Sequence, residues 1–163
     1  LTTSSAASDV YKRQGQHKEA LKNVNIALAL RPSYADALGV KATALLGLKM
    51  PLEALQSLAK ARKLNPNFSI EYLSIEVIAH LMMEEWSQAK EIATLALQRL
   101  PEHEPSLVMV IMADVALGNM EDALWNLEEL LILNPDFKFQ TWQFGDFKFL
   151  NEIALQTAKK IYE

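Results

Sequence analysis

The 163-residue sequence contains no cysteine, which excludes disulfides and thiolate metal sites and is compatible with a reducing compartment. It has only five glycines, and because they are scattered singly, no glycine-rich phosphate loop is present. Lysine and arginine are outnumbered by aspartate and glutamate, 16 to 20, and form no cluster. The resulting net charge of −4 argues against a nucleic-acid partner.

A hydrophobic run long enough to cross a membrane is also missing. The longest nearly apolar stretch, LVMVIMADVALG, starts at Leu107 and is interrupted by Asp114, whereas a spanning helix needs about 20 residues. Residues 1–14 do not contain the apolar core of a secretory signal. The composition, 50% hydrophobic and 22% charged, is typical of a globular chain. We therefore expect no membrane partner and a cytoplasmic location.

What the sequence does contain is a repeat. Four of the six prolines are spaced at intervals of 34, 35 and 34 residues, and an alanine precedes each of these four by twelve residues. The prolines are Pro32, Pro66, Pro101 and Pro135, and the alanines are Ala20, Ala54, Ala89 and Ala123. A small residue lets two helices approach closely, and a proline ends a helix. This period predicts an all-α fold, a solenoid of stacked antiparallel helix pairs.

The period also predicts the boundaries of the repeats. We expect a partial pair at 15–33, full pairs at 34–68, 69–103 and 104–136, and an aromatic-rich C-terminal cap with a capping helix at 137–163. The expected helices are 16–30, 34–47, 51–64, 69–83, 85–99, 104–117 and 120–133, with a short helix at 138–143 and a longer one at 147–162 in the cap.

Residues 1–14 do not share the apolar period of the repeats. Their string SSAASDVYKRQ is similar to the translated adapter ends found in predicted protein fragments. We expect this stretch to be non-native or disordered, the helix at 16–30 to have lost its partner, and the chain to be a fragment of a larger bacterial protein.

From about Gly15 to Asp136, the residues that recur at equivalent positions of each repeat (the repeat columns) resemble the tetratricopeptide repeat (TPR). Gly15 and Gly118 lie five residues before their alanines, where that family often has a glycine between its two helices; Lys49 and Glu84 hold that place in the other units. The large aromatic residue usual early in the first helix is replaced by leucine. The resemblance implies a protein-binding scaffold.

In such a solenoid the first helix of each pair lines a concave face, where partners bind. The predicted protein-binding residues are Asp36, Gly39, Thr43, Leu46, Glu71, Ser74, Ile78, Leu81, Val108, Met112 and Val115. This groove is mostly apolar. Relatives that hold the carboxylate end of a chaperone peptide carry lysine, asparagine and arginine in these columns. None of those residues occurs here, so we expect no carboxylate clamp.

The expected helix at 104–117 is apolar nearly all round, which is typical of a helix buried on every side. Either the chain's own C-terminal segment covers it, or a partner or second copy lies in the groove. The first explanation is favoured because the aromatic-rich string FKFQTWQFGDFKF comes directly after the last repeat. The second predicts an exposed patch around Val108, Met112 and Val115.

The C-terminal segment carries a second resemblance. The run from Asn134 to Phe137, then Trp142, and a helix ending in Lys159, Lys160 and Tyr162 is similar to the end of the TPR region attached to bacterial class III adenylate cyclases and to some transcriptional regulators. This resemblance implies a sensory or assembly module with a catalytic or DNA-binding domain upstream.

No catalytic constellation is visible, and we expect no cofactor, metal site or enzymatic activity. Glu76, His80 and Glu84 share a helical face, but an ordinary ion-pairing surface is the favoured interpretation. His103 is expected in a solvated turn. His80 and Asp114 occupy the same column in successive units, so we expect these two side chains to pair and fix the register.

The sequence therefore favours a non-enzymatic protein–protein interaction module. The alternative is the C-terminal regulatory or assembly region of a bacterial signalling enzyme such as an adenylate cyclase. A third interpretation is a structural spacer or dimerising arm.

Overall fold

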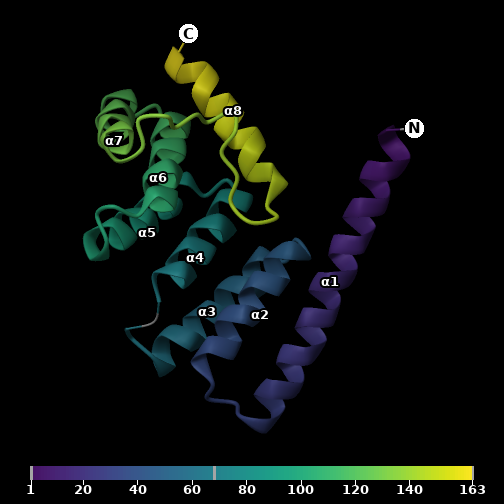
Figure 1. Ribbon diagram of the computed structural model, residues 1–163. Coiled ribbons are helices and arrows are strands. Elements are labelled where there is room, and N and C mark those ends of the chain that lie inside the picture. The colour runs from purple at the N-terminus through teal and green to yellow at the C-terminus, as the bar shows by residue number, and fades with distance from the viewer. Residues whose placement is uncertain (1, 68, 163) are drawn as a thin grey trace. The chain divides into compact units, whose positions relative to one another are not determined.

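The computed structural model describes residues 2–67 and 69–162, with side chains from residue 15 onward. Over this part of the chain the structure consists of eight α-helices, with no strand (Figure 1). The helices form two compact units, Leu1–Tyr72 and Leu73–Glu163.

The first unit holds α1 (Thr2–Leu30), α2 (Ala35–Gly47), α3 (Pro51–Leu64) and the start of α4 (Ile70–Met82). Successive helices run antiparallel, and α2 contacts both α1 and α3 (Figure 1). A Cβ atom at Gly47 would overlap the His17 ring, so this glycine lets α1 approach α2 closely. Pro51 opens α3, where its missing N–H leaves no hydrogen bond unmade.

Helix α1 is longer than the sequence suggested. Its backbone is helical from Thr2, so the expected start near residue 16 is wrong. Gly15 lies inside this helix and not in a turn. Because residues 2–14 contain no proline, nothing interrupts the hydrogen-bond ladder. Residues 1–14 were expected to be disordered or non-native, yet the backbone of residues 2–14 is helical. A non-native origin of this stretch stays a prediction. The side chains of residues 2–14 are outside the part that the structure describes.

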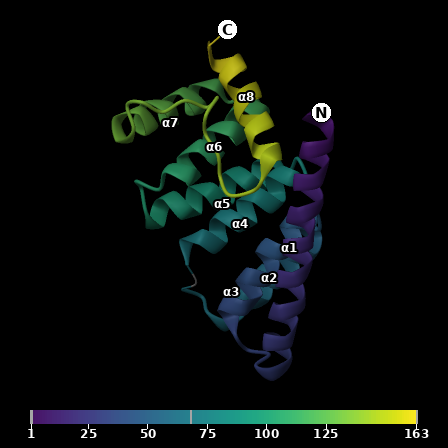
Figure 2. The ribbon, with the colours of Figure 1, turned by 45° about the vertical axis from the view of Figure 1, so that its right-hand side comes forward.

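The second unit holds the rest of α4 and four further helices: α5 (Trp86–Arg99), α6 (Glu104–Leu117), α7 (Met120–Leu133) and α8 (Lys148–Tyr162). Helix α6 contacts α5, α7 and α8. In both ribbon views α6 lies between α7 and α8 (Figures 1 and 2). From α2 to α8, the observed helix bounds agree with the expected ones within one residue.

The short helix expected at 138–143 is absent, and this part of the chain forms turns in which the Trp142 N–H donates to the Lys138 carbonyl at 3.1 Å. Phe137 and Phe139 are both buried, with ring centroids 4.9 Å apart and ring planes at 88°. In these turns the two rings pack edge to face in the core, a tertiary contact that outweighs a weak local helix preference.

The alanine columns lie in the core of each helix pair. Ala54, Ala89 and Ala123 are 0% exposed, as are the residues five positions before each of the same prolines, Ala61, Ala96 and Leu130. These small residues face the neighbouring helix, where a larger side chain would hold the two backbones apart.

The turn before each repeat proline has one geometry. Asn65, Leu100 and Asn134 have φ of −138°, −143° and −136°. Each donates its N–H to the carbonyl four residues back, at 2.9, 3.0 and 2.8 Å. The extended backbone is the one a following proline imposes, so these prolines end α3, α5 and α7 as the sequence indicated.

The turns within the pairs also repeat. Lys49, Glu84 and Gly118 have φ of 61°, 59° and 79°, in the left-handed region. The next residue in each turn donates its N–H to the carbonyl five residues back, at 2.9 Å in all three turns. This is the Schellman motif, which satisfies carbonyls at a helix end. Two of the three positions hold side chains that this conformation disfavours.

Candidate functional site

In the first unit the predicted concave residues divide into accessible and buried ones. Asp36 and Glu71 are exposed and Thr43 is half-buried, whereas Gly39 and Leu46 are buried. The accessible members of this predicted set are therefore polar, although Val40, one turn from Asp36 on α2, is 50% exposed.

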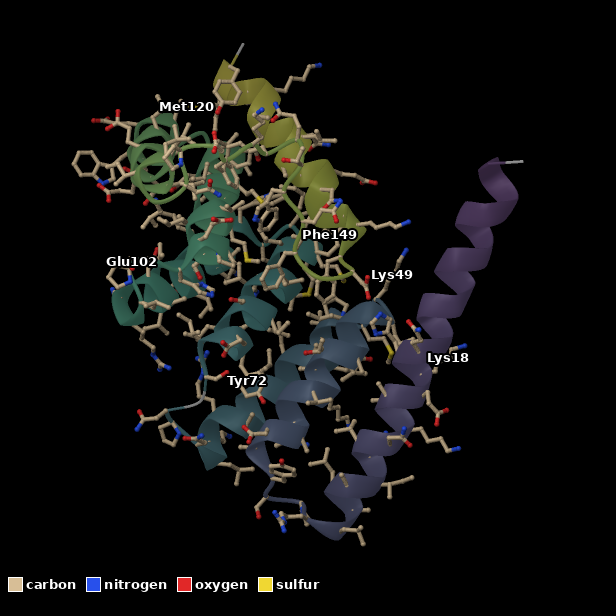
Figure 3. All side chains as sticks on the ribbon, in the orientation of Figure 1. Lys18, Lys49, Tyr72, Glu102, Met120 and Phe149 are labelled. Atoms are coloured by element: carbon tan, nitrogen blue, oxygen red, sulfur yellow. The ribbon has the colours of Figure 1, made fainter. Side chains whose placement is uncertain are left out.

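Gly39 is covered by the ring of Tyr72, which Figure 3 labels at the start of α4. A Cβ atom at Gly39 would overlap that ring. The Tyr72 hydroxyl donates to the Asp36 carbonyl at 3.3 Å and lies 3.4 Å from its Oδ1. Burial raises the pKa of the Tyr72 phenol, and the Asp36 carboxylate raises it further. Gly39 thus lets the Tyr72 ring pack closely on α2 within the first unit.

In the second unit the predicted concave residues are all buried. They are Ser74, Ile78, Leu81, Val108, Met112 and Val115. Helix α8 of the same chain contacts α6, and Leu150 and Ala154 of α8 are 0% exposed. The patch that a missing partner would leave around Val108 and Met112 is therefore not exposed.

The expected pair between His80 and Asp114 is wrong. His80 Nδ1 lies 2.7 Å from Glu85 Oε2, and Asp114 Oδ1 lies 2.6 Å from Lys90 Nζ. Asp114 is 0% exposed. A buried carboxylate is stabilised most by a cation that reaches it directly, and the long Lys90 side chain on α5 does so.

Lys90 joins three helices through two carboxylates. Besides Asp114 on α6 it contacts Asp122 Oδ2 on α7 at 2.8 Å. Its hydrogen bonds to Asp114 and Asp122 raise the pKa of the Lys90 ammonium, although partial burial opposes the shift. Asn119 Nδ2 donates to Asp114 Oδ1 at 3.3 Å, and Asp114 Oδ2 has no hydrogen-bond partner among the described residues. The signal that the sequence offered was a lone acid in an apolar helix, which requires a cation nearby.

An open hollow of about 370 Å³ lies beside this cluster, between α5 and α7. Its border includes Lys90, Thr94, Gln98, Asp122, Trp125 and Asn126. The Trp125 side chain is 68% exposed, although tryptophan is among the side chains that gain most from burial. Sequence reasoning missed this surface because it lies on the second helices of the pairs and not on the concave columns.

A second hollow of about 270 Å³ borders α8. It is lined by Gln140, Leu155, Ala158, Lys159 and Tyr162. Leu155 and Tyr162 are exposed on this helix. Both hollows lie within the second unit.

The remaining polar candidates are structural. His103 lies in the turn before α6, as expected, but it is half-buried, and its Nδ1 lies 2.8 Å from Ser106 Oγ at the start of α6. Within residues 2–67 and 69–162, no group of three or more histidine, cysteine, aspartate or glutamate side chains is placed to hold a metal ion. Among the helices of the described residues, none combines the length and apolarity needed to span a bilayer.

Comparison with known proteins supports the fold. The sequence matches no protein-family model, and no curated protein matches it either. The structure is similar to the crystal structure of MamA, a TPR-containing protein, with a TM-score of 0.71 over 93% of this chain and 90% of that chain. The two sequences are 19% identical. The chain therefore has the fold of a tetratricopeptide-repeat solenoid.

Proposed function

We propose that this chain is a non-enzymatic protein-interaction module that binds a protein or peptide on the faces of its helix pairs. The observation that carries the proposal is the TPR-like fold, which is typical of scaffolds. The hollows on α5, α7 and α8 are open and bordered by exposed aromatic side chains. Aromatic residues are enriched at protein interfaces and contribute much of their binding energy.

In the first unit the accessible residues of the predicted concave face are the proposed partner contacts. Asp36 and Glu71 are carboxylates and Thr43 is a neutral hydroxyl, so this surface favours a neutral or cationic segment. Two carboxylates would repel the carboxylate end of a peptide, which supports a partner other than a chaperone tail. We further propose that the repeat boundaries deduced from the prolines mark the binding units, and that the protein acts in the bacterial cytoplasm.

The test uses the immobilised chain to capture proteins from a bacterial lysate, with Glu71→Lys as the variant and Glu53→Lys as its control. Both glutamates are exposed, but Glu53 lies on α3, outside the predicted concave columns. We expect the wild type and Glu53→Lys to retain the same specific proteins and Glu71→Lys to lose them. If the wild type retains nothing beyond what an unrelated helical-repeat protein retains, the proposed function is wrong.

A further inference from the structure

Helix α7 carries an exposed apolar stripe with acidic borders. Trp125 and Ile132, seven residues apart, lie on one face because seven residues make almost two turns. They are 68% and 74% exposed. The charged residues of α7 are Glu121, Asp122, Glu128 and Glu129, all exposed, and the helix contains no lysine or arginine. The opposite face, with Ala123, Leu127 and Leu130, is buried.

Helix α8 carries a stripe of the same spacing and has an excess of positive charge. Leu155 and Tyr162, again seven residues apart, are 49% and 62% exposed. The helix contains three lysines, Lys148, Lys159 and Lys160, and one glutamate, Glu152, all of them exposed. Its buried face holds Leu150, Ala154, Thr157 and Ala158.

The two stripes match in apolar spacing and are opposite in charge. Each also borders a hollow with an exposed aromatic side chain on its rim, Trp125 on α7 and Tyr162 on α8. Apolar side chains in register would contact one another while the flanking carboxylates face lysines, which is the arrangement that steers association and fixes register. The chain itself supplies a helix of this kind, because α8 has three lysines and one glutamate whereas α7 has four acids and no basic residue.

We propose that the α7 stripe of one copy binds the α8 stripe of a second copy. This inference rests on the proposed function and names a partner for it. In both ribbon views α7 and α8 lie on different sides of α6, and their buried faces are turned to the core (Figures 1 and 2). The two stripes therefore face away from each other in one chain, so the contact forms between copies.

Such a contact is head-to-tail: each copy uses a different surface from its neighbour. An interface of this kind does not close on itself in a dimer, so a bound pair still has one free stripe at each end. The contact involves one face of one helix on each side and buries less than a standard interface of about 1,600 Å². Association is therefore weak and concentration-dependent, forming short rows of copies.

The test is sedimentation velocity of the whole chain over a concentration series, with a variant for each stripe. Trp125→Glu blocks the α7 stripe, and Leu155→Glu/Tyr162→Glu blocks the α8 stripe. We expect the wild type to form concentration-dependent oligomers and each variant alone to be monomeric. Because each variant keeps one intact stripe, a mixture of the two should form a 1:1 dimer that grows no further.

Two controls keep the result interpretable. Leu52→Glu changes a side chain on α3 that is 63% exposed and belongs to neither stripe, so it should associate like the wild type. Glu128→Lys/Glu129→Lys reverses two charges beside the α7 stripe and leaves Trp125 in place. It should raise the apparent Kd of self-association about tenfold or more. Circular dichroism confirms that each variant is folded.

A monodisperse wild-type monomer at the highest concentration would overturn the proposal, as would variants that associate normally. A mixture that stays monomeric while the wild type associates would show a different contact, and would overturn it as well. Capture of lysate proteins through Glu71 is independent of either stripe. If capture succeeds and self-association fails, the proposed function stands and only the second copy as partner is wrong.

Discussion

Helices α2 and α6 each form the first helix of a pair, but they have different surroundings. In α2, Val40 is 50% exposed and Asp36 reaches solvent. In α6, ten consecutive residues from Ser106 to Val115 are buried, because α5, α7 and α8 all contact the helix. The same position in the repeat can therefore be a surface or a core, and the helices that pack against that face decide between the two.

The largest expected effect tests the charged group inside α6. Lys90→Ala should lower the free energy of unfolding by about 3 to 5 kcal/mol, because it leaves the buried Asp114 carboxylate without its cation. Urea denaturation measures the change. Lys60→Ala on the exposed face of α3 is the control and should change stability by less than about 0.5 kcal/mol. A second change, Asp114→Leu in the Lys90→Ala background, should recover most of the loss.

The same pair gives a pH dependence. The pKa of Lys90 is raised in the folded protein above its ordinary 10.5. The stability that its charge contributes is therefore complete below pH 10.5 and is lost as the pH rises through the folded-state pKa. The difference in unfolding free energy between wild type and Lys90→Ala should narrow above that pH. A difference that stays constant to the alkaline limit would show that the lysine charge is not involved.

The next prediction tests whether packing of α8 stabilises α6. Leu150→Ala removes a side chain of α8 that is 0% exposed and should cost about 2 to 5 kcal/mol. Leu155→Ala is the matched control, since the same atoms are removed from an exposed position, and should cost much less. Hydrogen exchange should accelerate in α6 in the first variant only. If both variants exchange alike, α8 does not protect α6.

A smaller effect is expected in α2, the more exposed of the two helices compared above. Gly39→Ala places a methyl group where the Tyr72 ring lies, and should cost about 1 to 3 kcal/mol. Gly15→Ala is the control: its Cβ meets no atom within 4 Å, and alanine is favoured in a helix by about 1 kcal/mol. The two substitutions should therefore change the melting temperature in opposite directions. Equal shifts would mean that Tyr72 does not pack on α2.

The smallest effect tests the turns after α4 and α6. Glu84→Gly should stabilise the protein by roughly 1 kcal/mol, since φ is 59° there and glycine adopts it without strain. Gly118→Ala, at the equivalent turn with φ of 79°, should destabilise it by a similar amount. Thermal unfolding of the two variants measures both changes. An unchanged midpoint for Glu84→Gly would mean that the turn relaxes at no cost.

The sequence predicts the helices well because their boundaries depend on local chemistry. The proline after Asn65 and its equivalents forces the preceding residue into an extended conformation, and a buried alanine must recur at a fixed distance. The start of α1 was not predictable in this way, because residues 2–14 have no apolar period. The turns around Phe139 were missed because long-range burial of two rings overrides local helix preference.

The candidate site was predicted less well, because it depends on contacts between helices that a single sequence does not reveal. Counting columns placed Val108 and Met112 on a groove but could not show that both would be buried in a helix that α8 also contacts. The partner of Asp114 was sought in the same column, at His80, whereas Lys90 reaches it from the second helix of the preceding pair. The exposed Trp125 had no place in the family pattern, so nothing in that pattern pointed to it.

The contact between α8 and α6 also limits where further repeats could be added. Where the first helix of a fifth pair would dock after α6, the chain has already placed α8. Because α8 already packs on α6, a pair added after Tyr162 would have to pack on α8 or displace it from α6.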